Sequence, residues 1–472
     1  MFELHHLSAV DQLDWLRRGE ISPRELVDHY LARIERLDGD LGAFVTVTPE
    51  QARQRAEELA SSPGRAAALW GLPLADKDLT ARAGVPTGYG SRAFSGYVPE
   101  ASDELADALD ATGGISLGKT NAPEFGMPSY TESLVAPPAR TPWDTARGAG
   151  GSSGGAAVAV SAGLLPIAPG SDGGGSVRIP AAATGLVGLK PSRGRVPAGT
   201  GLDGLGGLVV PGPLARSVAD AALLLDALVG AGEYDHATRA PSWDGGAYLN
   251  AAVRGEGRFQ LGVTRWSPWS DEYEIAPHPE SDDALALALR ELDALGHGIE
   301  DLPDPGAEPG YAAAFRTVWQ SGAAGIPVEE ERLDLLEPLT RWLVDEGRKL
   351  TAVDLGRAIS WLRDFERRTI RAFSGYDAII TPTLAMTPRP IGWYDHDDPE
   401  RNFAQQCAYT PWTSFVNVVG LPAITLPVHQ IADGLPMGVQ LIGRPGREDV
   451  LLAIGAQLER RLHWDRRHPP QW

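Results

Sequence analysis

Two serines in this 472-residue chain lie in glycine-rich segments that could build a hydrolytic site. Residues 150–155 read GGSSGG and include Ser152, and residues 172–178 read DGGGSVR and include Ser176. Glycine lets the main chain approach a ligand closely, so successive N–H groups can point into one concavity. Such a concavity would stabilise the oxyanion that forms when a serine attacks a carbonyl.

Glycine–serine runs are also typical of flexible surface loops. Here, however, apolar residues flank both runs, reading AAVAV after the first and LLPIA and VRIPAAA around the second. These flanks favour burial, and a buried loop must satisfy its backbone polar groups. We therefore expect both runs to be ordered.

A serine nucleophile needs a base, and a lysine is a candidate. The chain has no histidine between His29 and His236, so every histidine is remote in sequence from both glycine-rich segments. Lys77 stands at the end of an apolar run, WGLPLADKD. Burial disfavours a charged lysine and can lower its pKa by several units, which would make it a base. The alternative is a structural lysine paired with Asp76 or Asp78.

The elements that must position these residues alternate between short apolar runs and helical patterns. Buried strands are expected at residues 72–75, 115–117, 165–168, 186–189, 376–383, 422–428 and 438–443. Helices are expected at residues 8–36 (two, with Ser22 as an N-cap), 50–60, 103–111, 154–162, 217–228, 311–373 and 449–461, and a glycine-rich loop at 196–213. The alternation predicts an α/β fold with a central mixed sheet covered by helices on both faces.

No linker convincingly divides the chain. We therefore expect one domain over residues 1–472, with residues 1–62 as a helical segment packed on a sheet-containing catalytic core at residues 66–472. The late strands could complete the sheet that the early strands begin.

Composition excludes several classes of function. The formal net charge of −20 and the pI near 4.9 disfavour binding to nucleic acid or to anionic membranes. No apolar stretch is long enough to span a bilayer, and residues 1–20 lack the pattern of a secretion signal. Cys407 is the only cysteine, which fits a reducing compartment and a cytoplasmic location.

Taken together, these motifs resemble the amidase signature family. The resemblance is an ordered series over most of the chain, at residues 71–78, 118–126, 142–144, 150–155, 170–181, 185–191, 420–423 and 434–443. It implies an amidase that releases a carboxylate and ammonia or an amine. Residues 150–181 carry the most specific part of the pattern. The chain departs from it at Gly173, where Thr or Ile is frequent.

The resemblance also implies roles for individual residues. Ser176 matches the nucleophile that forms an acyl-enzyme, Ser152 the bridging serine that follows a cis peptide bond, and Lys77 the base. The N–H groups of Gly173, Gly174, Gly175 and Ser176 would form the oxyanion hole. The family needs no metal or other cofactor, and a homodimer is possible.

The sequence indicates the substrate only as a small-molecule amide. Residues 127–133 are expected to line the pocket, and aromatic side chains further along the chain are candidates as well. The residues proposed to contact substrate are Met127, Tyr130, Thr131, Trp319 and Trp412.

Three alternatives remain open. The chain also resembles the amidase subunit of glutamyl-tRNA amidotransferase, although residues 208–217 look more like a free-standing amidase. Residues 150–154 fit the G-x-S-x-G elbow of an α/β-hydrolase esterase, which would need a histidine such as His396 or His429. Residues 113–120 fit a nucleotide-binding P-loop, but the surrounding pattern lacks the strand before and the helix after it.

Overall fold

The larger of two sheets forms the centre of the molecule. The computed structural model describes residues 3–62, 64–196, 204–229, 240 and 245–472. Within these residues, eight strands lie in the order β4-β6-β5-β10-β11-β9-β7-β8. Their bounds are β4 (Ile167–Asp172), β5 (Val187–Lys190), β6 (Val210–Ala215), β7 (Gln260–Val263), β8 (Gly298–Asp301), β9 (Ala378–Pro382), β10 (Ala423–Gln430) and β11 (Pro436–Gly443). Strand β7 is parallel to β8 and β9, and the other pairs are antiparallel, so the sheet is mixed.

A second, three-stranded sheet has the order β1-β3-β2, with bounds β1 (Phe44–Val47), β2 (Pro73–Lys77) and β3 (Ile115–Thr120). Strand β2 is parallel to β3 and packs against β4 of the larger sheet. The last residue of β2 is Lys77, and the last residue of β4 is Asp172. The two sheets therefore bring the candidate base near the second glycine-rich segment.

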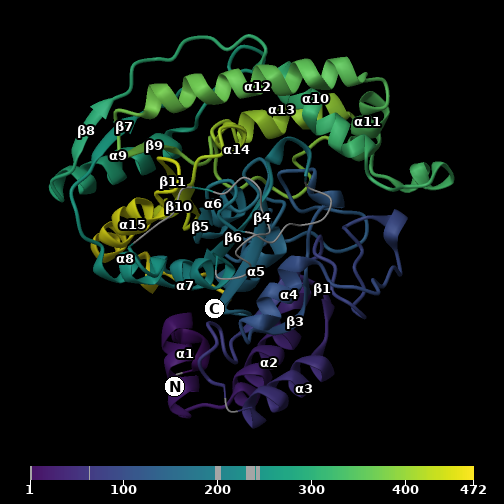
Figure 1. Ribbon diagram of the computed structural model, residues 1–472, viewed down its shortest axis with the longest axis vertical. Coiled ribbons are helices and arrows are strands. Elements are labelled where there is room, and N and C mark those ends of the chain that lie inside the picture. The colour runs from purple at the N-terminus through teal and green to yellow at the C-terminus, as the bar shows by residue number, and fades with distance from the viewer. Residues whose placement is uncertain (1–2, 63, 197–203, 230–239, 241–244) are drawn as a thin grey trace.

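Two groups of helices pack against the larger sheet: α5 (Gly154–Ser161) with α6 (Arg178–Thr184), and α7 (Val218–Val229) and α9 (Pro279–Ala294) with α15 (Glu448–Leu462). Helices α1 (Ala9–Arg18), α2 (Pro23–Leu41) and α3 (Pro49–Ser61) lie at one end of the molecule, whereas α10 (Tyr311–Ala324), α11 (Pro338–Gly347), α12 (Ala352–Phe373) and α13 (Pro399–Tyr409) lie at the other (Figure 1). The remaining helices are α4 (Glu104–Ala111), α8 (Tyr248–Arg254) and α14 (Ser414–Val418).

The predicted cap of α2 forms as the sequence indicates. Ser22 accepts a hydrogen bond from the Glu25 backbone N–H, while the Glu25 carboxylate accepts one from the Ser22 N–H, and Pro23 opens the helix. This reciprocal arrangement satisfies two backbone donors that a helix start otherwise leaves free. The α/β fold class is confirmed. The late strands join β4, β5 and β6 in one sheet, whereas the predicted early strands β2 and β3 belong to the separate smaller sheet.

Several expectations need correction. Residues 1–62 are not only helical, because β1 pairs with β3. The loop expected at residues 196–213 contains the start of β6, and its residues 197–203 lie outside the described part of the chain. The P-loop hypothesis is wrong: residues 115–120 are themselves β3, and Lys119 is buried, donating to the Thr80 carbonyl.

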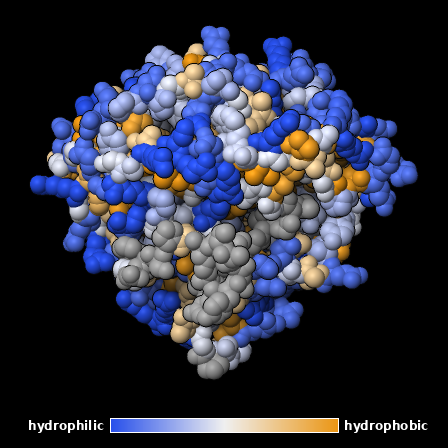
Figure 2. Space-filling model, turned by 45° about the horizontal axis from the view of Figure 1, so that its top comes forward, coloured by the Kyte–Doolittle hydropathy of each residue, from blue (hydrophilic) through white to orange (hydrophobic). Residues whose placement is uncertain are grey.

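The face of the molecule in Figure 2 is largely hydrophilic. Figure 2 shows hydrophilic side chains over most of the face that it presents, with hydrophobic side chains in small separate groups. Among the described residues, no helix is both long and apolar enough to cross a bilayer.

Candidate active site

Lys77 reaches two serine hydroxyls from the end of β2. Its Nζ lies 2.8 Å from Ser152 Oγ and 3.0 Å from Ser171 Oγ, and its side chain is buried. The neighbouring aspartates have other cations: Asp76 pairs with Arg82 at 2.6 Å, and Asp78 lies 3.9 Å from Lys119. Lys77 therefore has the hydroxyl contacts that a base would need, and each neighbouring aspartate has a cation other than Lys77 close to it.

Ser152 is held by a tightly packed loop just before α5. The Gly151–Ser152 peptide bond is cis. A Cβ on Gly151 would lie 2.6 Å from the Tyr130 carbonyl carbon, so only glycine fits there. The preceding residues, 141–153, are bends and turns without a strand, which rules out the strand–elbow–helix geometry of an α/β-hydrolase.

Ser176 stands between β4 and α6 and borders the same hollow as Ser152. The backbone carbonyl of Ser176 accepts a 3.1 Å hydrogen bond from the Ser153 N–H, which ties the two glycine-rich segments together. Ser176 keeps 8% of its surface exposed, whereas Ser152 keeps 2%. Ser176 is thus the more accessible of the two hydroxyls.

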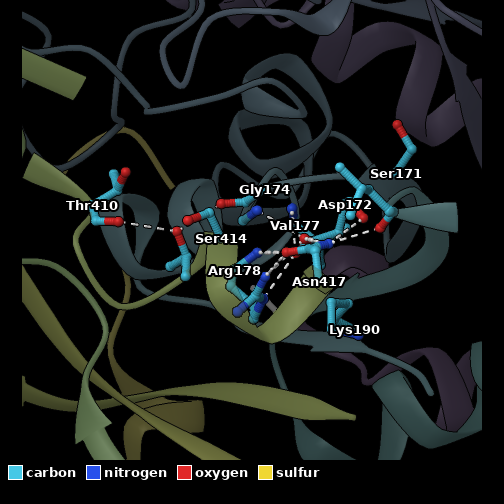
Figure 3. Close-up of polar contacts among 12 residues, drawn as sticks. Ser171, Asp172, Gly174, Val177, Arg178, Lys190, Thr410, Ser414 and Asn417 are labelled. Atoms are coloured by element: carbon cyan, nitrogen blue, oxygen red, sulfur yellow. Dashed lines mark hydrogen bonds and ion pairs between the residues drawn. The ribbon is translucent and has the colours of Figure 1, made fainter. Parts of the chain in front are cut away.

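A buried ion pair lies behind the loop that carries Ser176. Asp172 accepts from Arg178 Nη2 and Nε, both at 2.9 Å, and from the Gly175 N–H at 2.8 Å. Asn417 donates to the Asp172 carbonyl and carboxylate (Figure 3). Burial by itself would raise the pKa of the Asp172 carboxyl, but the charge and hydrogen bonds of Arg178 hold it well below its usual range. Asp172 therefore fixes the loop as a permanent anion.

Close packing requires two of the three glycines before Ser176, Gly173 and Gly175. Gly175 has φ +128°, and a Cβ there would lie 2.5 Å from Thr413 Oγ1. A Cβ on Gly173 would lie 2.8 Å from Val209 Cγ2, so the side chain common at this position in the family has no room. At Gly174 a Cβ would meet only atoms 3.9 Å away.

Two hollows meet at Ser176. The first, which we call the relay hollow, includes Ser152 and Ser171 in its wall and has a volume of about 700 Å³ with the solvent at its mouth. The second, which we call the aromatic hollow, measures about 480 Å³ in the same way. Met127 and Trp319 border both hollows, as the sequence suggested for pocket residues.

The other residues expected to contact substrate lie behind the walls. Tyr130 stacks on Tyr394 with ring centres 3.9 Å apart. Thr131 Oγ1 donates to the Gly150 carbonyl at 2.9 Å and so supports the cis-peptide loop. Trp412 is fully buried and donates to the Arg265 carbonyl. The described lining of the two hollows includes none of these three side chains.

Some residues that shape the site escaped the sequence analysis. Ser171 contacts Lys77, and Asn417 binds Asp172 from a helix about 240 positions later. Ser171 directly precedes the motif residue Asp172 on β4, so its position in the sequence could have indicated that it lies near Lys77. Asn417 had no such signal, because only tertiary folding brings α14 to the loop.

Possible metal ligands lie elsewhere. Among the described residues, one group has ligand atoms close enough together to hold an ion: Glu3, His5 and His29, near the N-terminus. The described walls of both hollows contain no histidine or carboxylate. His396 and His429, which the esterase hypothesis required, line neither hollow.

Comparisons with known proteins agree with this geometry. The sequence model of the family named Amidase matches residues 25–452. The chain is 36% identical to a Mycobacterium bovis protein named as an amidase, AmiB2, over 99% of this chain and 98% of that protein.

Solved structures give the same result. The structure of 6-aminohexanoate cyclic dimer hydrolase superimposes with a TM-score of 0.90 at 31% identity, covering 100% of both chains. That of a bacterial aryl acylamidase of the amidase signature family superimposes with a TM-score of 0.84 at 27% identity, covering 98% of this chain and 97% of that one. The chain therefore belongs to the amidase signature family and is an enzyme that hydrolyses amide bonds.

Proposed function

We propose that Ser176 attacks the amide carbonyl, that Ser152 relays the proton and that Lys77 is the base. The observation that carries this proposal is the 2.8 Å contact between Lys77 Nζ and Ser152 Oγ at the wall of a hollow that Ser176 also borders. The hydroxyl of Ser171 lies 3.0 Å from the same Nζ and would orient the amine. A base must itself be held in place by a further group, and Ser171 meets that need.

In the first half of the reaction, neutral Lys77 takes the proton of Ser152 as Ser152 takes that of Ser176. Ser176 Oγ bonds to the carbonyl carbon, and the carbonyl π electrons move to oxygen. The N–H groups of Gly173, Gly174 and Ser176 would stabilise this oxyanion, whereas the Gly175 N–H, which the sequence also suggested, already donates to the Asp172 carboxylate. The Asp172–Gly175 hydrogen bond supports the proposal in another way, because it fixes the loop that carries the other donors.

The relay then runs in reverse. Ser152 donates its proton to the amide nitrogen and regains one from Lys77, so the C–N bond breaks with release of a neutral amine or ammonia. Protonation is needed because an amide anion is a poor leaving group. Water, deprotonated through the same relay, attacks the Ser176 ester, releases the carboxylate and restores the enzyme.

Removing the nucleophile and the base tests the proposal. We expect Ser176→Ala and Lys77→Met each to lower kcat on a hydrolysed amide by about 10⁴-fold or more. Mass spectrometry of the quenched wild-type reaction should place the acyl group on Ser176. Ser161→Ala, a buried serine of α5 that donates to the Thr184 carbonyl, and Lys349→Met on the surface are the controls. Undiminished turnover in Ser176→Ala would refute the mechanism.

A further inference from the structure

We infer that this enzyme acts on an uncharged amide with an apolar group on each side of the scissile bond. The inference rests on the proposed role of Ser176, because that serine stands where the two hollows meet. A substrate whose carbonyl carbon is within reach of Ser176 can extend into both hollows. The chemistry of each wall then decides which groups are accepted.

The wall of the relay hollow is largely apolar apart from its three serines, Ser152, Ser171 and Ser176, and most of its apolar side chains are aliphatic. Leu79, Val318 and Ile326 face this space, with Gly322 of α10 between the last two in the chain. A Cβ added to Gly322 would meet nothing within 4 Å, so the glycine leaves part of the hollow empty. Aliphatic walls bind apolar groups by removing them from water.

The wall of the aromatic hollow is formed by rings, among them Trp269, Phe315 and Phe403. Two of its polar side chains, Ser414 and Gln406, already have partners inside the protein. Ser414 Oγ lies 2.9 Å from Trp269 Nε1, and Gln406 bonds the Ser129 N–H and the Asn402 side chain. These groups therefore do not call for a polar substrate, and the rings favour an apolar one.

Trp319 separates the two hollows. Its side chain borders both hollows and stacks on Phe315 with ring centres 5.5 Å apart. It also lies close to residues 173–176, which we call the oxyanion loop, because a Cβ on Gly173 would lie 3.5 Å from its ring. The partition stands beside the loop that would bind the carbonyl oxygen. An amide lying across it would place its two substituents in different hollows.

Neither hollow offers a partner for a charge. None of the described lining residues is Asp, Glu, Lys, Arg or His. The nearest buried charges behind the oxyanion loop, Asp172 and Arg178, are paired with each other. A substrate carboxylate or ammonium buried here would lose its hydration without compensation, which costs several kcal/mol. This argues against amino-acid amides such as glutamine.

The position of Ser152 indicates which hollow each substituent of the amide occupies. The leaving nitrogen must receive its proton from Ser152, and Ser152 borders the relay hollow but not the aromatic hollow. The amine substituent therefore occupies the relay hollow, and the acyl substituent occupies the aromatic hollow. The substrate class is a neutral N-substituted amide, with a cyclic amide as a special case in which the two substituents are joined.

A charge series tests the first part. The probes are butyranilide, its para-carboxylate and para-trimethylammonium derivatives, and succinanilate, which carries the carboxylate on the acyl side. We expect kcat/KM to fall at least 100-fold for each charged probe relative to butyranilide. The same order should appear in Kd measured calorimetrically with Ser176→Ala, which binds without turnover. Charged and neutral probes within threefold of each other in both measurements would overturn the inference.

Filling the relay hollow tests the second part. Gly322→Leu should lower kcat/KM for butyranilide at least tenfold while leaving butyramide, which has no amine substituent, within about twofold. Gly356→Leu is the matched control, because Gly356 is an exposed glycine of α12 with equally free space around it. If Gly322→Leu instead discriminates by acyl length, between acetanilide and hexananilide, the assignment of sides is overturned.

The two proposals fail differently. Hydrolysis that survives in Ser176→Ala refutes the catalytic mechanism, whatever the substrate preference. Ser176-dependent hydrolysis of glutamine or of the charged anilides, with butyranilide refused, refutes the neutral-substrate inference and leaves the mechanism intact.

Discussion

Two buried carboxylates near the site are held in opposite ways. Asp172, behind the loop that carries Ser176, is paired with Arg178 and kept ionised. Glu337, just before α11, accepts from the Leu134 N–H, and its own N–H donates to the buried Glu124. Burial, and then the charge of Glu124, raises the pKa of Glu337 to about 7.

The difference separates a fixed part of the site from a titratable one. The loop before Ser176 rests on an anion that keeps its charge at any ordinary pH. The segment that carries Met127, by contrast, lies between Glu124 and Leu134, and the Leu134 N–H donates to the Glu337 carboxyl. Because the pKa of Glu337 is raised to about 7, its carboxyl changes charge near neutrality. The charge of the neighbouring group, rather than burial alone, decides whether a buried carboxyl stays ionised or has a raised pKa.

The largest expected effect comes from breaking the paired region. Asp172→Asn leaves Arg178 buried without its counter-ion and should lower the free energy of unfolding by about 3–5 kcal/mol. Chemical denaturation measures this loss. Asp364→Asn, in a surface pair with Arg367, should leave the free energy of unfolding nearly unchanged. Equal effects for the two variants would show that the buried pair is not the stronger support.

A smaller effect is expected from the titratable region, as a pH dependence. The folded-state pKa of Glu337 is raised from 4.5, so its contribution to stability is complete below about pH 4.5 and is lost as pH rises through 7. Glu337→Gln cannot titrate and should gain up to about 3 kcal/mol relative to wild type between pH 4.5 and 7.5. Glu331→Gln, an exposed neighbour, serves as the control. Parallel stability–pH curves for wild type and Glu337→Gln would contradict the assignment.

The smallest effect is expected from Asn417, which adds hydrogen bonds to the Asp172–Arg178 pair. Asn417 accepts from Arg178 Nη2 at 2.6 Å and donates to the Asp172 carbonyl at 2.7 Å. Asn417→Ala keeps the ion pair but leaves these groups short of partners, so the free energy of unfolding should fall by about 1–3 kcal/mol. Chemical denaturation of wild type and Asn417→Ala under the same conditions measures this loss.

The three residues that the sequence singled out for catalysis lie close together in the structure, whereas the residues that support them were harder to predict. Glycine frames and an apolar strand end marked Ser152, Ser176 and Lys77, because the chemistry of these segments depends on residues adjacent in the chain. The α/β class followed from alternating patterns. Strand β6 was hidden because it reads VPGPLA, and glycine and proline usually indicate a loop.

Features that depend on contacts between residues far apart in the chain left no local pattern in the sequence. That β2 and β3 form a separate sheet with β1 depends on pairing between residues about 70 positions apart, such as Val47 and Gly118. Trp412 was a reasonable pocket candidate by type, but its indole is buried against the Arg265 carbonyl. Aromatic identity does not tell a core side chain from a lining one.

The division of the proposed reacting groups, Lys77 and Ser176, between two sheets has a consequence for inactivation. Lys77 ends a strand of the small sheet and Ser176 follows a strand of the large one, and the two sheets meet where β2 packs on β4. A sub-global opening at this seam would pull the amine away from the hydroxyl while both sheets kept their internal ladders. Turnover would then vanish at a lower denaturant concentration than the far-ultraviolet circular dichroism.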